Sequence, residues 1–264
     1  MRQPIRLRRD HAASDALRGL ADLLGVAVVT REAGRRLFRG DGAVLSEAAP
    51  AAVVLPGDEH ELMEAVRYCH HHGLEMVPRG GATSLRGGAV GRAESVVIAT
   101  TRLNRIIEVD RRDRLVRAQA GATLTNIAAA AGAAGLCLSV APAGRSPATL
   151  GGGIAKNSPG RVGPAAGAVA GLVEELRLVT SRGDLVEIRA GGSVCGGYDL
   201  AGLIAGSEGA FGIISQATLR LGPALAAARL VVARFDDADA AFAAAEGVAL
   251  LGLGTVSVEV IGGA

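Results

Sequence analysis

The sequence predicts an α+β fold, in which a small parallel βαβ unit precedes a larger, mainly antiparallel sheet flanked by helices. The βαβ unit is indicated by two short apolar runs, 52–55 and 75–77, on either side of one amphipathic stretch, because strands joined by a helical crossover run parallel. The antiparallel sheet is indicated by later apolar or alternating runs that turn residues separate. With 264 residues, 49% of them hydrophobic, the chain can bury a sizeable core.

The first part of the chain has recognisable helix ends. A charged lead-in covers residues 1–47, with one helix expected at 14–24. In the βαβ unit, Asp58 caps a helix, and Glu61 three residues later has the spacing of a capping box. The apolar face of this helix consists of Leu62, Val66 and Cys69. Gly73 is its expected C-terminal stop.

The remaining elements follow from alternation, apolar runs and turn residues. Strands are expected at 95–99, 105–109, 115–118, 175–180, 185–189 and 212–221, and helices at 122–134 and 199–205. Gly222-Pro223 should break the chain. A strand at 230–234, a helix at 236–246 and a strand at 255–261 should then begin another domain. We therefore divide the chain into a lead-in (1–47), a central domain (48–223) and the start of a truncated C-terminal domain (224–264).

Composition argues against several classes of protein. The net charge is only +2, the arginines are dispersed and aromatic residues make up 2%, so no nucleic-acid surface is expected. The longest uncharged stretch, 122–144, is mostly Ala and Gly, which predicts no transmembrane segment. Charged residues interrupt any signal-peptide core near the N-terminus. The three cysteines lack CxxC spacing and are expected to be reduced thiols: Cys69, Cys137 and Cys195. We expect a cytoplasmic protein.

Three glycine-rich segments are candidate ligand-binding loops. The first glycine loop, residues 78–88, follows a strand, and its adjacent glycines, Thr83 and Ser84 can present amides and hydroxyls to a pyrophosphate. The second glycine loop, residues 149–157, places three glycines ahead of a short helical stretch. The third glycine loop, residues 206–214, is a tight turn that leads into a strand. Each one alone is equally well a structural turn, but three in one domain indicate a long ligand.

Other sites are disfavoured. The chain contains no GxGxxG and no Gly-Lys-Ser/Thr after a strand, which argues against Rossmann and P-loop sites. The run Cys69-His70-His71-His72 cannot direct three side chains at one metal ion, because consecutive helical residues point about 100° apart. Favourable interaction with the helix C-terminus explains this run better, and no metal site is assigned. Lys156, the only lysine, is either a solvated helix residue or a group that approaches a flavin or a substrate carboxylate.

The three loops together carry a resemblance to a known family. Residues 78–85 (PRGGATSL) resemble the PRGGGTSL loop of FAD domains in the p-cresol methylhydroxylase / vanillyl-alcohol oxidase superfamily. Residues 148–157 resemble its ATIGGNIATN segment, and residues 197–200 with 206–214 resemble its GYDL…GSEGTLGIIT segment. The match covers about residues 48–223 in the right order. The sequence is similar to the branch with glycolate oxidase subunits, D-lactate dehydrogenases and D-2-hydroxyglutarate dehydrogenases.

The resemblance implies a two-subdomain FAD-binding domain of the p-cresol methylhydroxylase (PCMH) type over 48–223. The backbone and hydroxyls of the first loop would hold the pyrophosphate, through Arg79, Gly80, Gly81, Ala82, Thr83 and Ser84. The ribityl and isoalloxazine region would be lined by Pro142, Ser146, Thr149, Gly151, Gly152 and Asn157. The adenosine side would be surrounded by Glu208, Gly209, Gly212 and Ile213. The first loop has no His of the kind that tethers FAD in some members, so FAD should be non-covalent.

The sequence also departs from the family pattern. Ala82 replaces a Gly, which strains the loop if this residue has a positive φ. Ala166 takes the position of a usual Tyr, and Gly171 that of a customary Asp.

The resemblance further implies oxidation of a 2-hydroxy acid, such as glycolate, D-lactate or D-2-hydroxyglutarate, to the 2-oxo acid by hydride transfer to flavin N5. The groups that orient and deprotonate the substrate come largely from the domain after Pro223, so no catalytic residue is assigned. A partner subunit or a downstream chain would supply that domain or the electron acceptor. The alternative is a non-catalytic FAD-binding or electron-transfer subunit, or a truncated relic without a substrate domain.

Overall fold

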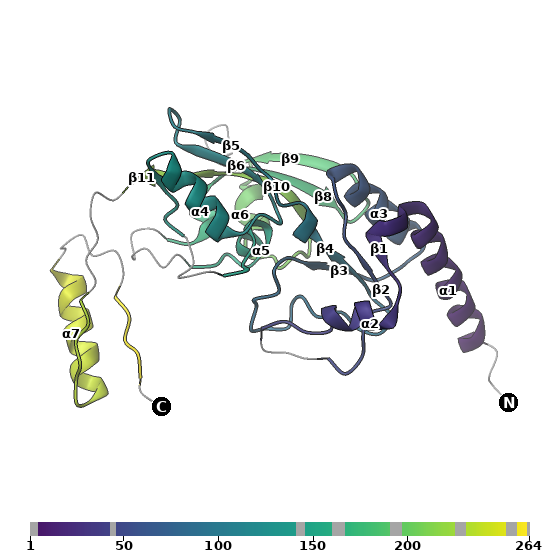
Figure 1. Ribbon diagram of the computed structural model, residues 1–264, viewed down its shortest axis with the longest axis horizontal. Coiled ribbons are helices and arrows are strands. Elements are labelled where there is room, and N and C mark those ends of the chain that lie inside the picture. Colours follow the sequence, from purple (N-terminus) through teal and green to yellow (C-terminus); the bar gives the residue numbers. More distant parts are fainter. Residues whose placement is uncertain are drawn as a thin grey trace.

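The two main sheets of the described chain lie next to each other (Figure 1). The computed structural model describes residues 5–42, 46–140, 146–159, 167–190, 197–224, 231–251 and 258–262. The smaller sheet contains, in spatial order, β1 (Val28–Val29), β2 (Ala52–Val54), β4 (Val96–Ala99) and β3 (Met76–Arg79). The larger contains β5 (Ile106–Asp110), β6 (Leu115–Gln119), β10 (Gly212–Arg220), β8 (Val173–Thr180) and β9 (Leu185–Arg189). This arrangement confirms the predicted α+β class.

The smaller sheet is built around the predicted βαβ unit. Strands β2 and β3 run in the same direction, as expected, but β4 lies between them and pairs with both in parallel. The short β1 adds an antiparallel edge next to β2. All four residues of β4 are fully buried, which suits the centre of a sheet that is covered on both faces. Strand β3 leads directly into the first glycine loop.

Helix α3 (Glu59–His71) has the ends that the sequence predicts, with one difference. The Asp58 carboxylate accepts a hydrogen bond from the Glu61 amide at 2.8 Å. The Glu61 carboxylate accepts from the amide of Gly57 at 2.7 Å, rather than from the Asp58 amide of a standard capping box. The predicted apolar face is buried, and Gly73 follows the helix with φ 64°. Helix α1 (Ile5–Leu24), which begins before the predicted start at residue 14, and the short α2 (Glu32–Arg35) complete this side of the molecule.

The larger sheet is antiparallel throughout, with β10 between β6 and β8. Three helices pack side chains into its core: α4 (Leu124–Ala133), α5 (Leu150–Ala155) and α6 (Leu200–Ile204). Thr123, Thr149 and Asp199 cap them through their side chains. The expected break at Gly222-Pro223 is instead a short strand, β11 (Gly222–Pro223), which pairs with β7 (Leu136–Cys137). Proline is tolerated there because this two-stranded ribbon leaves its missing N–H at an edge.

Apolar and ionic contacts join the two sheets. Val179 of β8 and Ile213 of β10 belong to the same buried cluster as α3 and the smaller sheet. A carboxylate oxygen of Glu59 lies 3.0 Å from Nη2 of Arg177, and both side chains are mostly buried. Ser215 donates a hydrogen bond to the same carboxylate. The two sheets are therefore held in a fixed relation, with loops between them.

The C-terminal residues are organised differently from the prediction. The expected helix is present as α7 (Ala238–Leu250), with Asp237 as its cap. The strand predictions are wrong for the described residues 231–234 and 258–261, which form no strand, while residue 230 and residues 255–257 lie outside the described chain. An apolar run becomes a strand only where it meets a partner edge, and the described residues of these two runs pair with no strand. No residue of α7 is buried, and Figure 1 shows this helix apart from the sheets.

No helix within the described residues combines the length and the apolar character needed to cross a bilayer.

Candidate flavin site

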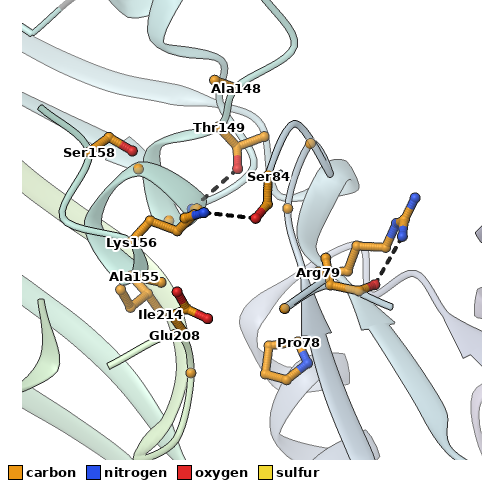
Figure 2. Close-up of a pocket in the computed structure, with 18 of the residues that line it drawn as sticks. Pro78, Arg79, Ser84, Ala148, Thr149, Ala155, Lys156, Ser158, Glu208 and Ile214 are labelled. Atoms are coloured by element: carbon orange, nitrogen blue, oxygen red, sulfur yellow. Dashed lines mark hydrogen bonds between the residues drawn. The ribbon is translucent and has the colours of Figure 1, made fainter. Parts of the chain in front are cut away.

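The three glycine loops meet around one cavity between the two sheets (Figure 2). The cavity has a volume of about 490 Å³, within the range of small-molecule and cofactor sites. Segments of all three loops line it, at sequence positions 78–89, 148–159 and 207–214. Residues more than a hundred positions apart in the sequence are therefore brought to a common surface.

The first loop packs directly against the second loop and the residues just before it. A Cβ atom added to Gly81 would lie 1.9 Å from the carbonyl oxygen of Pro147. One added to Gly80 would lie 2.3 Å from Oγ1 of Thr149 and 3.6 Å from the Cα of Gly152. Glycine is required at both positions because no side chain fits between these segments.

The third loop closes the ring around the cavity. Its amides at Gly206 and Glu208 donate to the carbonyl oxygens of Ile154 and Ala155, at 3.0 and 2.8 Å, and so attach it to the end of α5. Gly209, with φ 89°, packs on the Pro78 ring, where an added Cβ would lie 2.9 Å from Cγ. Each loop thus contacts the other two.

The first loop offers free backbone donors at three successive residues. Within the described chain, the amides of Gly81, Ala82 and Thr83 donate to no protein acceptor. In the second loop, by contrast, the amides of Gly151 and Gly152 donate to Ala120 O (2.8 Å) and Thr149 Oγ1 (3.3 Å). The glycines of the second loop therefore provide bare Cα surface for a flat group, and the first loop provides the donors that an anion needs.

Backbone strain is concentrated around this cavity. Four non-glycine residues in the described chain have positive φ, and three of them line the cavity: Ala82 (52°), Asn157 (48°) and Glu208 (53°). The value for Ala82 confirms that the replacement of Gly in the first loop places an alanine in the left-handed region. Conformations of this kind persist only where the surrounding structure enforces them, and they are typical of ligand sites.

Arg79 fixes the shape of the first loop rather than reaching across the cavity. Its Nη1 donates to the carbonyl oxygens of Ala89 (3.0 Å) and Phe38 (3.3 Å), and its guanidinium lies 5.4 Å from the centre of the Phe38 ring. Burial lowers the pKa of Arg79, and the nearby Asp41 partly offsets this effect. The bond to Ala89 ties the strand end before the loop to the chain just after it.

Lys156 and Ser84 connect the second loop to the first. Lys156 is half-buried, and its Nζ donates to Oγ of Ser84 at 2.7 Å (Figure 2). The amide of Arg86 also donates to this Oγ, at 3.2 Å. Of the two alternatives for Lys156, a solvated helix residue or a group near a ligand, the structure supports the second by placing this half-buried side chain in the cavity lining.

The structure brings nearly all of the predicted site residues to the cavity. Those that line it are Arg79, Gly80, Gly81, Ala82, Thr83, Ser84, Thr149, Gly151, Gly152, Asn157, Glu208, Gly209, Gly212 and Ile213. Ser146 is absent from the lining because its hydroxyl accepts from the Ala148 amide and its backbone bonds to Thr125. Pro142 lies outside the described residues. Three further residues line the cavity and were not selected from the sequence: Ser207, which lies within the third glycine loop, and Thr100 and Ser158, which carry no distinguishing motif.

The described cysteines and histidines outside this site form no metal centre. Within the described residues, no group of three His, Cys, Asp or Glu side chains is placed to hold a metal ion. Cys69 is fully buried, and burial raises its pKa to about 12. His72 stacks on Tyr68 with ring centres 4.2 Å apart. Cys137 is also a free thiol, and Cys195 lies outside the described residues.

The cavity fits an extended ligand that has a phosphate-bearing middle and flat ends. The free amides at 81–83 form a donor cluster for a phosphate, and the glycine surfaces of the second loop leave room for a ring system. The fold and the site therefore define a domain that binds a dinucleotide between two subdomains, by loops unlike those of a Rossmann fold.

Comparisons with known proteins identify the family. Residues 50–189 match the model of the FAD binding domain family. The chain is 31% identical over 212 residues to glycolate oxidase subunit GlcD of Bacillus subtilis (strain 168), covering 79% of this chain and 45% of that protein. It is 38% identical over 177 residues to D-2-hydroxyglutarate dehydrogenase of Xanthomonas citri pv. viticola, covering 65% of this chain and 37% of that protein. The chain belongs to the FAD binding domain family, and its cofactor is FAD.

A solved structure supports the fold. An alkyldihydroxyacetonephosphate synthase matches with a TM-score of 0.71 and 24% identity, over 80% of this chain and 40% of that one. The fold is the two-subdomain, PCMH-type FAD-binding fold that the resemblance implies. The chain spans less than half the length of the curated relatives described above.

Proposed function

We propose that this chain binds FAD non-covalently between its two sheets and is the flavin-binding part of an oxidoreductase that converts 2-hydroxy acids to 2-oxo acids. The observation that carries the proposal is the closure of three glycine loops around one cavity, with free amides on one side of it. The names of similar proteins, glycolate oxidase subunit, D-2-hydroxyglutarate dehydrogenase and D-lactate dehydrogenase, support the substrate class.

Each loop has a distinct role in this proposal. The amides of 81–83 and the hydroxyl of Ser84 bind the pyrophosphate. Thr149, Gly151, Gly152 and Asn157 line the ribityl chain and the isoalloxazine ring, mainly as surface, because the amides of Gly151 and Gly152 are already bonded within the protein. The third loop, with Glu208, Gly209, Gly212 and Ile213, encloses the adenosine end.

The chemistry divides between cofactor and protein. FAD, when bound, supplies the acceptor for the hydride that leaves the α-carbon of the hydroxy acid. The hydroxyl proton must pass to a base, and the only carboxylate among the described residues that line the cavity is Glu208. We assign the base and the substrate carboxylate site to the part of the protein that follows Pro223. No residue of α7 is buried, which supports the proposal that residues 224–264 begin a domain separate from the two sheets.

The second candidate function is an FAD-binding or electron-transfer module without its own substrate site. The position of α7 favours this candidate: within the described chain, no residue of α7 lines the cavity and none is buried. In this case FAD binds, but hydroxy acids do not reduce it.

Flavin content and reduction test these alternatives. The purified protein should be yellow and should release free FAD on denaturation. Bound FAD should then be bleached anaerobically by at least one member of a panel of D-2-hydroxy acids, with the product of any downstream reading frame added in a parallel series. Colourless protein that cannot be reconstituted with FAD would refute both functions. FAD that binds but resists every acid in both series would leave only the module.

A further inference from the structure

Lys156 adds a positively charged side chain to the cavity, and the proposed function gives this side chain no role. It is the only lysine in the chain, and it stands where the family segment quoted above has Thr. Its side chain is half-buried and lines the cavity, and no carboxylate of the described chain lies within ion-pair distance of it. A half-buried ammonium that lines a cavity and has no protein counterion can bind an anion there.

The hydrogen bonds around Ser84 indicate where that anion binds. The Ser84 oxygen accepts from Lys156 Nζ at 2.7 Å and from the Arg86 amide at 3.2 Å, which uses both of its acceptor positions. Its own O–H must therefore donate to another group. An ammonium has three donors, and the bond to Ser84 uses one of them.

We propose that Lys156 and Ser84 together bind a phosphate of the cofactor, so that one ammonium and one hydroxyl extend the donor cluster formed by the amides of 81–83. Lysine is a common phosphate ligand, and a charged donor makes a stronger bond than a neutral one. The inference rests on the proposed function, because it assigns the phosphate to FAD. It adds that this chain uses a cation from the second loop, whereas the family segment has a hydroxyl residue.

Affinity for three ligands tests this assignment. FAD and ADP contain the pyrophosphate, whereas riboflavin contains the same isoalloxazine ring without any phosphate. In Lys156→Met we expect the dissociation constants of FAD and ADP to rise about 10- to 100-fold, as for loss of a hydrogen bond to a charged group. The dissociation constant of riboflavin should stay within about twofold of wild type. Arg112→Met, which removes one exposed positive charge from a turn, should change none of them.

The single lysine permits a second readout that involves no variant. An amine-selective acylating reagent can modify only Lys156 and the α-amino group, and peptide mass mapping separates these two products. We expect FAD and ADP to slow acylation of Lys156 at least about tenfold, and riboflavin to leave it unchanged.

The outcomes separate the inference from the proposed function. Wild-type protein that fails to bind FAD at all would refute the proposed function. Wild-type protein that binds FAD, with Lys156→Met binding it equally well, would overturn the inference alone. Equal losses for FAD and riboflavin would also overturn it, because they would place Lys156 at the ring or show a general distortion. Circular dichroism and the urea midpoint of Lys156→Met identify a variant that fails to fold; the acylation experiment then decides.

Discussion

Gly81→Ala tests the contact on which the site is built. A Cβ at this position would lie 1.9 Å from the Pro147 carbonyl oxygen, and both groups belong to backbone that cannot rotate away. The first and second loops would have to separate by roughly 1.5 Å to restore a normal contact. Forced repacking of this size costs about 1–3 kcal/mol of unfolding free energy. It also moves the free amides out of hydrogen-bonding distance of a ligand that stays on the second loop.

Urea denaturation and FAD titration measure the two effects of this substitution. Gly81→Ala should unfold at a lower urea concentration than wild type, and its dissociation constant for FAD should rise at least about tenfold. The matched control is Gly132→Ala, in helix α4, where an added Cβ meets nothing within 4 Å. The control should gain about 0.5–1 kcal/mol, because alanine is the better helix former. A Gly81→Ala protein with wild-type stability and FAD affinity would refute the described packing of the loops.

Three further predictions follow from the structure. Ala82→Gly should raise the unfolding free energy by about 1 kcal/mol, since relief of a left-handed alanine outweighs the added freedom of the unfolded chain; a fall in the urea midpoint would contradict this. Burial raises the pKa of the Cys69 thiol from its ordinary value of 9.0 to about 12. As the pH rises, the thiol therefore ionises in the unfolded state before it ionises in the folded state. The unfolding free energy should therefore fall between pH 9 and 12, by up to about 1.4 kcal/mol per pH unit more than in Cys69→Ala. Equal pH dependence of the unfolding free energy in the two proteins would refute this prediction. Glu59→Gln should cost about 1–2 kcal/mol because it weakens the mostly buried pair with Arg177, whereas Glu32→Gln, in an exposed pair, should stay within about 0.5 kcal/mol by the same urea assay.

Local signals in the sequence were sufficient for most elements. Alternation and capping residues located helix α3 and most strands of both sheets, because these signals act within a few residues. They did not reveal β1, whose two residues are too short a run to show alternation. They could not reveal that β4 inserts between β2 and β3, or that Gly222-Pro223 pairs with β7, since such pairings depend on distant segments. The predicted strand at 230–234 failed for the same reason: Val231 and Val232 are apolar, but the described residues 231–234 pair with no strand.

The candidate site, too, could be predicted only in part from the sequence. Its glycine loops were visible as patterns, and the structure brings them together at one cavity. The sequence did not show which amides remain free, because that depends on acceptors such as Ala120 O and Thr149 Oγ1, which the fold places beside the second loop. It also could not place Ser146, whose hydroxyl is used in a local turn, or bring Lys156 to Ser84.

In the proposed site, the amides of Gly81, Ala82 and Thr83 bind the cofactor. Hydrogen–deuterium exchange of the peptide over residues 78–88, measured with and without stoichiometric FAD, tests it most directly. These amides lack protein acceptors, so we predict rapid exchange in the free protein and strong protection when FAD is bound. Unchanged exchange in this peptide, in a sample shown to hold FAD, would show that these amides do not bind the cofactor.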